Sequence, residues 1–122
     1  MIHNIKVKGG FMINSLKYPL GYLLTKNKFI NKYNWSEYQL GDNWILYYDK
    51  RNEFECVKSG STQIVTLGYF LDIRNGQLNR SSIINTLINS RKNSYEEFLD
   101  ELSYLNGRYL IILIHNGETL LF

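Results

Sequence analysis

The sequence predicts an α+β protein made mainly of antiparallel sheets with two helices. Ten tyrosines, six phenylalanines, one proline and no alanine favour strands over helices. The hydrophobic period also changes along the chain, from two in the first half to about 3.6 between residues 83 and 105. A length of 122 residues suits one domain, so we expect a single domain over residues 1–122.

The first half is predicted to be a meander of strands joined by turns. Glycine, asparagine and aspartate separate short apolar or alternating segments, which is typical of hairpins. The first two expected strands pair across Gly9-Gly10, and the last ends at Gly68. The predicted strands are residues 5–8, 11–13, 22–25, 35–40, 44–48, 53–57 and 63–67.

Two helices are predicted in the second half. Ser81 or Ser82 is expected to cap the first, whose apolar face runs from Ile83 to Ile88. The second begins at Ser94-Tyr95-Glu96-Glu97, a capping box in which the serine and Glu97 bind each other's backbone amides. Its core face is Phe98, Leu99, Leu102 and Leu105, and Asn106-Gly107 is expected to end it.

The chain is predicted to end in a hairpin. Tyr109–Ile114 reads as a buried strand, Asn116-Gly117 as a type I′ turn and Thr119–Phe122 as the return strand. Because this last strand is apolar and nothing follows it, we expect an edge lent to a partner, or a domain incomplete at its C-terminus.

Charge and cysteine content narrow the class of protein. The net charge is +3, but lysine and arginine are scattered, which argues against nucleic acid as a partner. One cysteine excludes an internal disulfide and favours a reducing, cytoplasmic location, and no apolar run is long enough for a membrane span. The composition is typical of an AT-rich bacterial or phage genome.

The residues that carry chemistry form no recognisable catalytic set. Cys56 alternates with Phe54 and reads as a small buried hydrophobe more readily than as a nucleophile. His3 and His115 have no ligand-type residue at metal-binding spacing, so no metal and no cofactor are predicted. An aromatic cluster could be a core ladder or a ligand platform: Trp35, Tyr38, Trp44, Tyr47 and Tyr48.

Three segments resemble the N-terminal, class II glutamine-amidotransferase domain of the asparagine synthetase family. Leu67–Asp72 is similar to a family strand that ends in an N-G-E-I-Y-N loop. Phe98–Gly107 is similar to its acidic-leucine helix, and Arg108–Ile114 to the strand that follows. Gly21–Leu24 resembles the opening strand more loosely.

The resemblance implies a fold and an activity. Such domains are αββα sandwiches with an N-terminal nucleophile, in which an N-terminal cysteine hydrolyses glutamine. An Asn-Gly pair forms the oxyanion hole, and an acidic residue holds the amine of the substrate. These groups must converge on one carbonyl carbon for the reaction to proceed.

This chain departs from that pattern at the glutamine site. Leu20 precedes the Gly21 strand where the resemblance implies the nucleophile, and residue 2 is Ile2. Leu67 replaces the oxyanion asparagine, Gly68 matches, and Tyr69 replaces the acid. Cys56 lies within the chain, where it has no free α-amine as its base. We therefore expect no glutaminase activity.

The predicted function is that of a catalytically inactive scaffold or partner domain for an asparagine-synthetase-like, ATP-dependent amide-forming enzyme. The alternative is a standalone binding module for a peptide or an anionic ligand. The expected partner is a synthetase-like chain or a second copy of this chain, with no membrane. The interaction surface is predicted to comprise Trp35, Tyr38, Trp44, Tyr47, Leu120 and Phe122.

Overall fold

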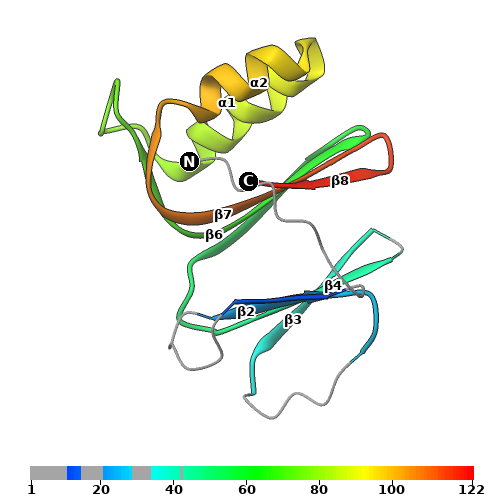
Figure 1. Cartoon of the computed structure of the whole chain (residues 1–122). Helices are drawn as coiled ribbons and strands as arrows, with labels where there is room; N and C mark the ends of the chain where they lie inside the picture. The colour runs from blue at the N-terminus through cyan, green and yellow to red at the C-terminus, as the bar shows by residue number, and fades with distance from the viewer. Residues whose placement is uncertain (1–10, 15–20, 29–33, 42) are drawn as a thin grey trace. The chain divides into compact units, whose positions relative to one another are not determined.

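The computed structural model describes residues 11–14, 21–28, 34–41 and 43–122 (Figure 1). They contain two helices and two antiparallel sheets of four strands each, which confirms the predicted α+β class. They fall into two compact units, one within residues 5–53 and one within residues 54–122. The predicted strand at 5–8, the Gly9-Gly10 turn and Leu20 lie outside the described residues.

The first unit is a sheet in the order β1-β2-β4-β3. Its strands are β1 (Phe11–Asn14), β2 (Tyr22–Thr25), β3 (Ser36–Leu40) and β4 (Trp44–Tyr48). The β3–β4 hairpin confirms the prediction. The single meander is wrong, because β2 pairs with β4 rather than with β3, and the strands that follow form another sheet.

The second unit holds a sheet in the order β5-β6-β7-β8. Its strands are β5 (Phe54–Ser59), β6 (Thr62–Asp72), β7 (Leu105–His115) and β8 (Glu118–Leu121). β5 pairs with β6 only as far as Leu67 and β8 pairs with β7 only beyond Tyr109, so the other ends of β6 and β7 continue as a two-stranded ribbon. The predicted end of a strand at Gly68 is therefore wrong.

Two glycines let the β6–β7 ribbon form. Gly68 has a φ of +94°, and a β-carbon there would lie 2.3 Å from the carbonyl oxygen of Arg108. Gly107 has a φ of +145°, and its β-carbon would lie 2.2 Å from the carbonyl oxygen of Tyr69. Only glycine fits such an approach of two backbones, so Gly68 continues the strand.

The first helix, α1 (Arg80–Asn93), begins one residue after its cap. The cap is Asn79, whose Oδ1 accepts a hydrogen bond of 2.8 Å from the amide of Ser82. The predicted serine cap is wrong because Ser81 and Ser82 already lie in the first turn. Asparagine is as good a cap as serine, so residue preference alone did not separate them.

The second helix, α2 (Tyr95–Leu102), begins as predicted but ends early. Ser94 Oγ accepts from the amide of Glu97 at 3.1 Å. The reciprocal bond is absent because the Ser94 amide donates to Ser90 of α1, while the Glu97 carboxylate accepts from Asn93. Asn106-Gly107 does not end the helix, because the chain turns at Ser103 and residues 105–107 already belong to β7.

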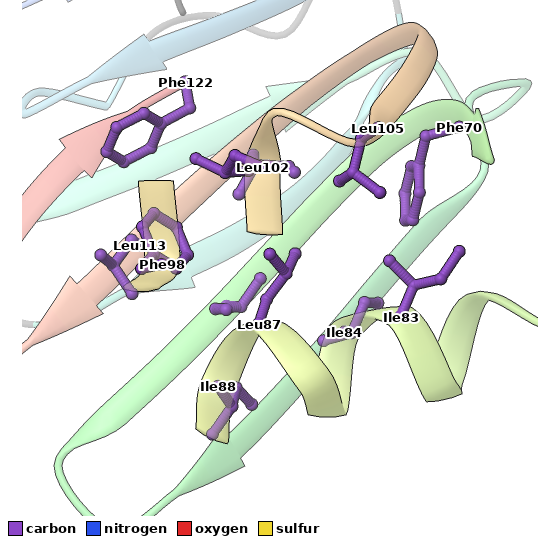
Figure 2. Close-up of a cluster of buried hydrophobic side chains, with 12 residues drawn as sticks. Phe70, Ile83, Ile84, Leu87, Ile88, Phe98, Leu102, Leu105, Leu113 and Phe122 are labelled. Atoms are coloured by element: carbon purple, nitrogen blue, oxygen red, sulfur yellow. The ribbon is translucent and has the colours of Figure 1, made fainter. Parts of the chain in front are cut away.

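The two helices cover one face of the second sheet and form its core. α1 contributes Ile83, Ile84, Leu87 and Ile88, as predicted, and α2 contributes Phe98 and Leu102. Figure 2 shows these side chains directed at Phe70, Leu105, Leu113 and Phe122. Phe98 is fully buried and meets the Phe122 ring edge-on at 5.2 Å. Burying a side chain of this size contributes about 2–3 kcal/mol, so this cluster is the main stabilising feature of the unit.

A four-residue turn of sequence Asp-x-Arg-Asn lies at the end of one strand in each unit. Asp49-Lys50-Arg51-Asn52 follows β4, and Asp72-Ile73-Arg74-Asn75 begins at the last residue of β6; we call them the Asp49 turn and the Asp72 turn. In each, one carboxylate oxygen accepts from the arginine amide, at 2.9 and 2.8 Å, and both accept from the guanidinium. The asparagine amide donates to the aspartate carbonyl.

Candidate functional site

The residues that resemble the glutamine site lie where β6 passes beyond the end of β5. Leu67 is buried, with 3% of its surface exposed, and Gly68 follows it in the ribbon. The direction in which Gly68 would carry a side chain is filled by the Arg108 carbonyl. An apolar, buried Leu67 offers no hydrogen-bond donor to an oxyanion, so this position stabilises the sheet.

Arg80 occupies the space beside the Gly68 carbonyl. Its guanidinium donates a hydrogen bond to the carbonyl oxygen of Gly68 and lies 4.9 Å from the centre of the Phe70 ring. The same guanidinium lies 3.8 Å from Oε2 of Glu55 on β5. Arg80 therefore ties the start of α1 to both β5 and β6.

Glu55, on β5, supplies a negative charge at the start of α1. The first turn of α1 contains no acidic residue, although a negative charge there interacts favourably with the helix dipole. The Ser81 hydroxyl donates to Glu55 Oε1 at 3.0 Å, which places the carboxylate at that turn. Glu55 thus meets the start of α1 through a hydrogen bond from Ser81 to Oε1 and an ion pair of Oε2 with Arg80.

The side chain of Tyr69 points into solvent. It is 59% exposed and carries no negative charge with which to hold a substrate amine. Across the ribbon, Tyr109 packs edge-on against Phe70 with ring centres 5.8 Å apart. Burial raises the pKa of the Tyr109 phenol, so its hydroxyl stays protonated at neutral pH.

Cys56 lies within β5 and makes a structural contact. Its Sγ accepts a hydrogen bond of 3.0 Å from the Gln63 amide on the adjacent strand. The side chain is partly buried rather than fully buried as the alternation suggested. This cross-strand hydrogen bond gives the thiol a packing role in the sheet.

Several residues of the predicted interaction surface lie inside the protein. Trp35 and Tyr47 are 7% and 1% exposed and pack with Leu23 and Ile45. Phe122 is 4% exposed and belongs to the core under α2. Their rings pack within this chain. These three are therefore core residues and not the surface residues that the sequence predicted.

Three residues of that surface are half-buried and reach solvent. Tyr38 and Trp44 lie on the β3–β4 hairpin, and Lys26 sits over the Trp44 ring at 5.0 Å. Leu120 lies on β8 and packs partly against the core. The aromatic cluster is therefore divided: Trp35 and Tyr47 are core residues, whereas Tyr38, Trp44 and Tyr48 are half-buried.

The sequence predicted a turn at residues 49–52, but the ion pairs of the two Asp turns and the contacts of Arg80 were missed. Arg74 bonds the carboxylates of both Asp72 and Glu101, each at 2.6 Å, and lies 3.9 Å from the centre of the Tyr104 ring. The repeated string Asp-x-Arg-Asn after two predicted strands was the available signal for the turns. No comparable local signal marks Arg80, because its partners come from β5 and β6.

The described residues show neither a metal-ligand cluster nor a membrane-spanning helix. No group of three or more histidine, cysteine, aspartate or glutamate side chains there could hold a metal ion. Within the same residues, neither helix is both long and apolar enough to cross a membrane.

No known protein family, curated protein sequence or solved structure matches the chain. The resemblance to the class II glutamine-amidotransferase domain therefore rests on the residues quoted above.

Proposed function

We propose that this chain is a catalytically inactive, glutamine-amidotransferase-like domain that acts as a scaffold or partner for an asparagine-synthetase-like, ATP-dependent amide-forming enzyme. The observation that carries the proposal is the construction around Gly68. Buried Leu67 stands at the position of the oxyanion asparagine, and exposed Tyr69 stands at the position of the acidic residue. The carbonyl oxygen of Gly68 between them accepts a hydrogen bond from Arg80. Leu67 and Arg80 support the fold here, and neither Leu67 nor Tyr69 has the polar group that a glutaminase would need at its position.

Exposed apolar residues on the same ribbon support a binding role. Tyr69 and Ile73 are 59% and 61% exposed, and Leu78 in the following loop is 40% exposed. Large apolar side chains gathered in one exposed segment are typical of protein-binding surfaces. We place the protein in the cytoplasm, on the basis of its single cysteine.

The absence of glutaminase activity is tested by incubating the purified chain with glutamine and measuring ammonia. Release is expected to equal that of the buffer blank, because no described group provides the required nucleophile and oxyanion donor together. The Cys56→Ser variant is the matched control. Ammonia release by the native chain that disappears in Cys56→Ser would overturn the proposal in favour of an active hydrolase.

The partner role is tested by titrating the chain into an asparagine-synthetase-like, ATP-dependent amide-forming enzyme of the same organism. Saturable binding, weakened about tenfold or more by the Tyr69→Ser and Ile73→Ser double variant, is the expected result. Both positions are exposed, so the variant should keep its thermal stability. Absence of binding, together with saturable binding of a peptide or an anionic ligand, would favour the standalone binding module.

A further inference from the structure

We propose that β8 is a self-complementary edge strand through which two copies of this chain pair antiparallel, joining their second sheets into one continuous sheet. This inference is independent of the glutamine-site argument, since a paired and an unpaired chain would both lack glutaminase activity. It rests on the hydrogen-bond phase of β7 and β8, on the residues that β8 presents, and on its place in the sheet order.

The hydrogen-bond phase shows which backbone groups of β8 point away from the sheet. Ile111 and Phe122 exchange both backbone hydrogen bonds, at 2.9 and 2.8 Å. Because bonded and non-bonded pairs alternate in an antiparallel ladder, Leu120 and Glu118 also direct their N–H and C=O groups towards β7. Thr119 and Leu121 therefore direct theirs outwards, at the edge of the described sheet.

These outward groups match those of a second copy. With Leu120 opposite Leu120 of that copy, Thr119 faces its Leu121 and Leu121 faces its Thr119. Both members of each outer pair direct their N–H and C=O groups outwards, so the two strands form four backbone hydrogen bonds about a two-fold axis. No other register centred on this strand pairs all the outward groups.

The side chains of β8 fit this register as well. Leu120 is on the helix-covered face and half-buried, so the two leucines at the axis would cover each other. Glu118 falls opposite Phe122, so no like charges meet. On the same face as Phe122, Tyr95 is 38% exposed with its ring 6.4 Å from the Phe122 ring, which adds apolar surface beside the edge.

Within the described residues, the two edge strands of this sheet differ in charge: β5 carries two charged side chains, whereas β8 carries one, Glu118 at its start. β5 carries Glu55 and exposed Lys58, and charged side chains on an edge strand oppose pairing with another chain. Thr119, Leu120 and Leu121 carry no charge and no proline. The occupant that fits β8 best is therefore a strand with the same sequence running in the opposite direction.

The register is tested by cysteine crosslinking in the full chain. In a Cys56→Ser background, Leu120→Cys places two thiols at the axis in a non-hydrogen-bonded pair, where the α-carbons are about 4.5 Å apart and a disulfide fits. Glu118→Cys is the matched control, since its two copies would lie four residues apart along the paired strands. Mild oxidation is expected to crosslink Leu120→Cys at least about tenfold faster than Glu118→Cys. Equal rates, or no crosslinking of either variant, would overturn the proposal.

Sedimentation equilibrium of the native chain, from micromolar to millimolar concentration, provides the second measurement. We expect a reversible monomer–dimer equilibrium that Thr119→Lys weakens about tenfold or more, because the lysine would place charge at the paired edge. Asn106→Lys, at an exposed position of β7, is the control and should leave dimerisation unchanged. A native chain that stays monomeric throughout, or a dimer equally insensitive to both substitutions, would overturn the proposal.

Discussion

The Asp49 turn and the Asp72 turn have the same backbone and ion-pair geometry but different surroundings. Arg51 bonds Asp49 and is 66% exposed, whereas Arg74 bonds Asp72, is 43% exposed, and also reaches Glu101 on α2 and the ring of Tyr104. The string Asp-x-Arg-Asn is therefore sufficient to specify the turn. What the turn contributes to stability depends on whether a second element meets its arginine.

The largest difference is expected when the two aspartates are removed. We predict that Asp72→Ala lowers the free energy of unfolding by about 3 kcal/mol and Asp49→Ala by about 1.5 kcal/mol. Both lose an acceptor for a backbone amide, but only the Asp72 turn also orients an arginine towards a helix. Urea unfolding measures both values, with Asp72→Asn as a variant that retains the amide acceptor. Equal losses in the two turns would contradict the comparison.

Truncation of the arginines should give a smaller difference of the same sign. Arg74→Ala is expected to lower the stability measurably, because it removes the bonds to two carboxylates and the contact with Tyr104. Arg51→Ala is expected to have a smaller effect, since that guanidinium is largely solvated and bonds one carboxylate. The midpoint of urea unfolding is the measurement. A larger effect at Arg51 would show that the helix contact adds nothing.

The contribution of the contact with α2 can be isolated by a double-mutant cycle of Arg74→Ala and Glu101→Gln. We expect a coupling energy of about 1 kcal/mol, because the pair bonds at 2.6 Å with only 22% of the Glu101 side chain exposed. The matched cycle pairs Glu101→Gln with Lys92→Ala, since Lys92 bonds Ser59 instead. That cycle should show no coupling energy. Comparable coupling energies in both cycles would mean that the contact of Arg74 with α2 does not distinguish the Asp72 turn from the Asp49 turn.

The smallest expected difference is in acid sensitivity. Hydrogen bonds from Arg74 hold the pKa of Asp72 below its usual range, and those from Arg51 do the same for Asp49. A depressed folded-state pKa stabilises the fold above the usual value of about 4, and this stabilisation is lost as the pH falls through the folded-state pKa. Between pH 6 and pH 2, the free energy of unfolding should fall less in both asparagine variants than in the native chain. The reduction should be larger in Asp72→Asn than in Asp49→Asn, by less than about 1 kcal/mol. The reverse order would indicate that the Asp49 turn is the more strongly coupled.

Local signals in the sequence predicted most elements of the fold. The apolar positions from Ile83 to Ile88, the Ser94 cap and the Asn116-Gly117 turn all depend on residues within a few positions of one another. The structure has each of them, with φ values of +50° and +81° at Asn116 and Gly117. The cap of α1 was a local error, because Asn79 and the two serines are equally good caps, but the errors in strand order and strand length came from contacts that are distant in sequence. Gly68 continues a strand because Tyr109 lies opposite it, and β4 separates β2 from β3.

The candidate site was less predictable than the fold for the same reason. Arg80, Glu55 and Gly68 belong to three elements, and no spacing rule joins them. Aromatic residues were also ambiguous, because the sequence of the β3–β4 hairpin does not say which rings face the core. Tyr47 and Trp35 proved to be buried, while Trp44 stays half-exposed under Lys26.

The position of Glu55 at the start of α1 has a consequence for the order of folding. α1 lacks an acidic residue in its own first turn and takes that charge from a strand 26 positions away from Ser81. Asn79 caps α1 locally, as Ser94 caps α2, but the carboxylate at the first turn of α1 is in place only after β5 has docked. In refolding followed by hydrogen exchange, the amides of the first turn of α1 should gain protection together with β5 and later than those of α2.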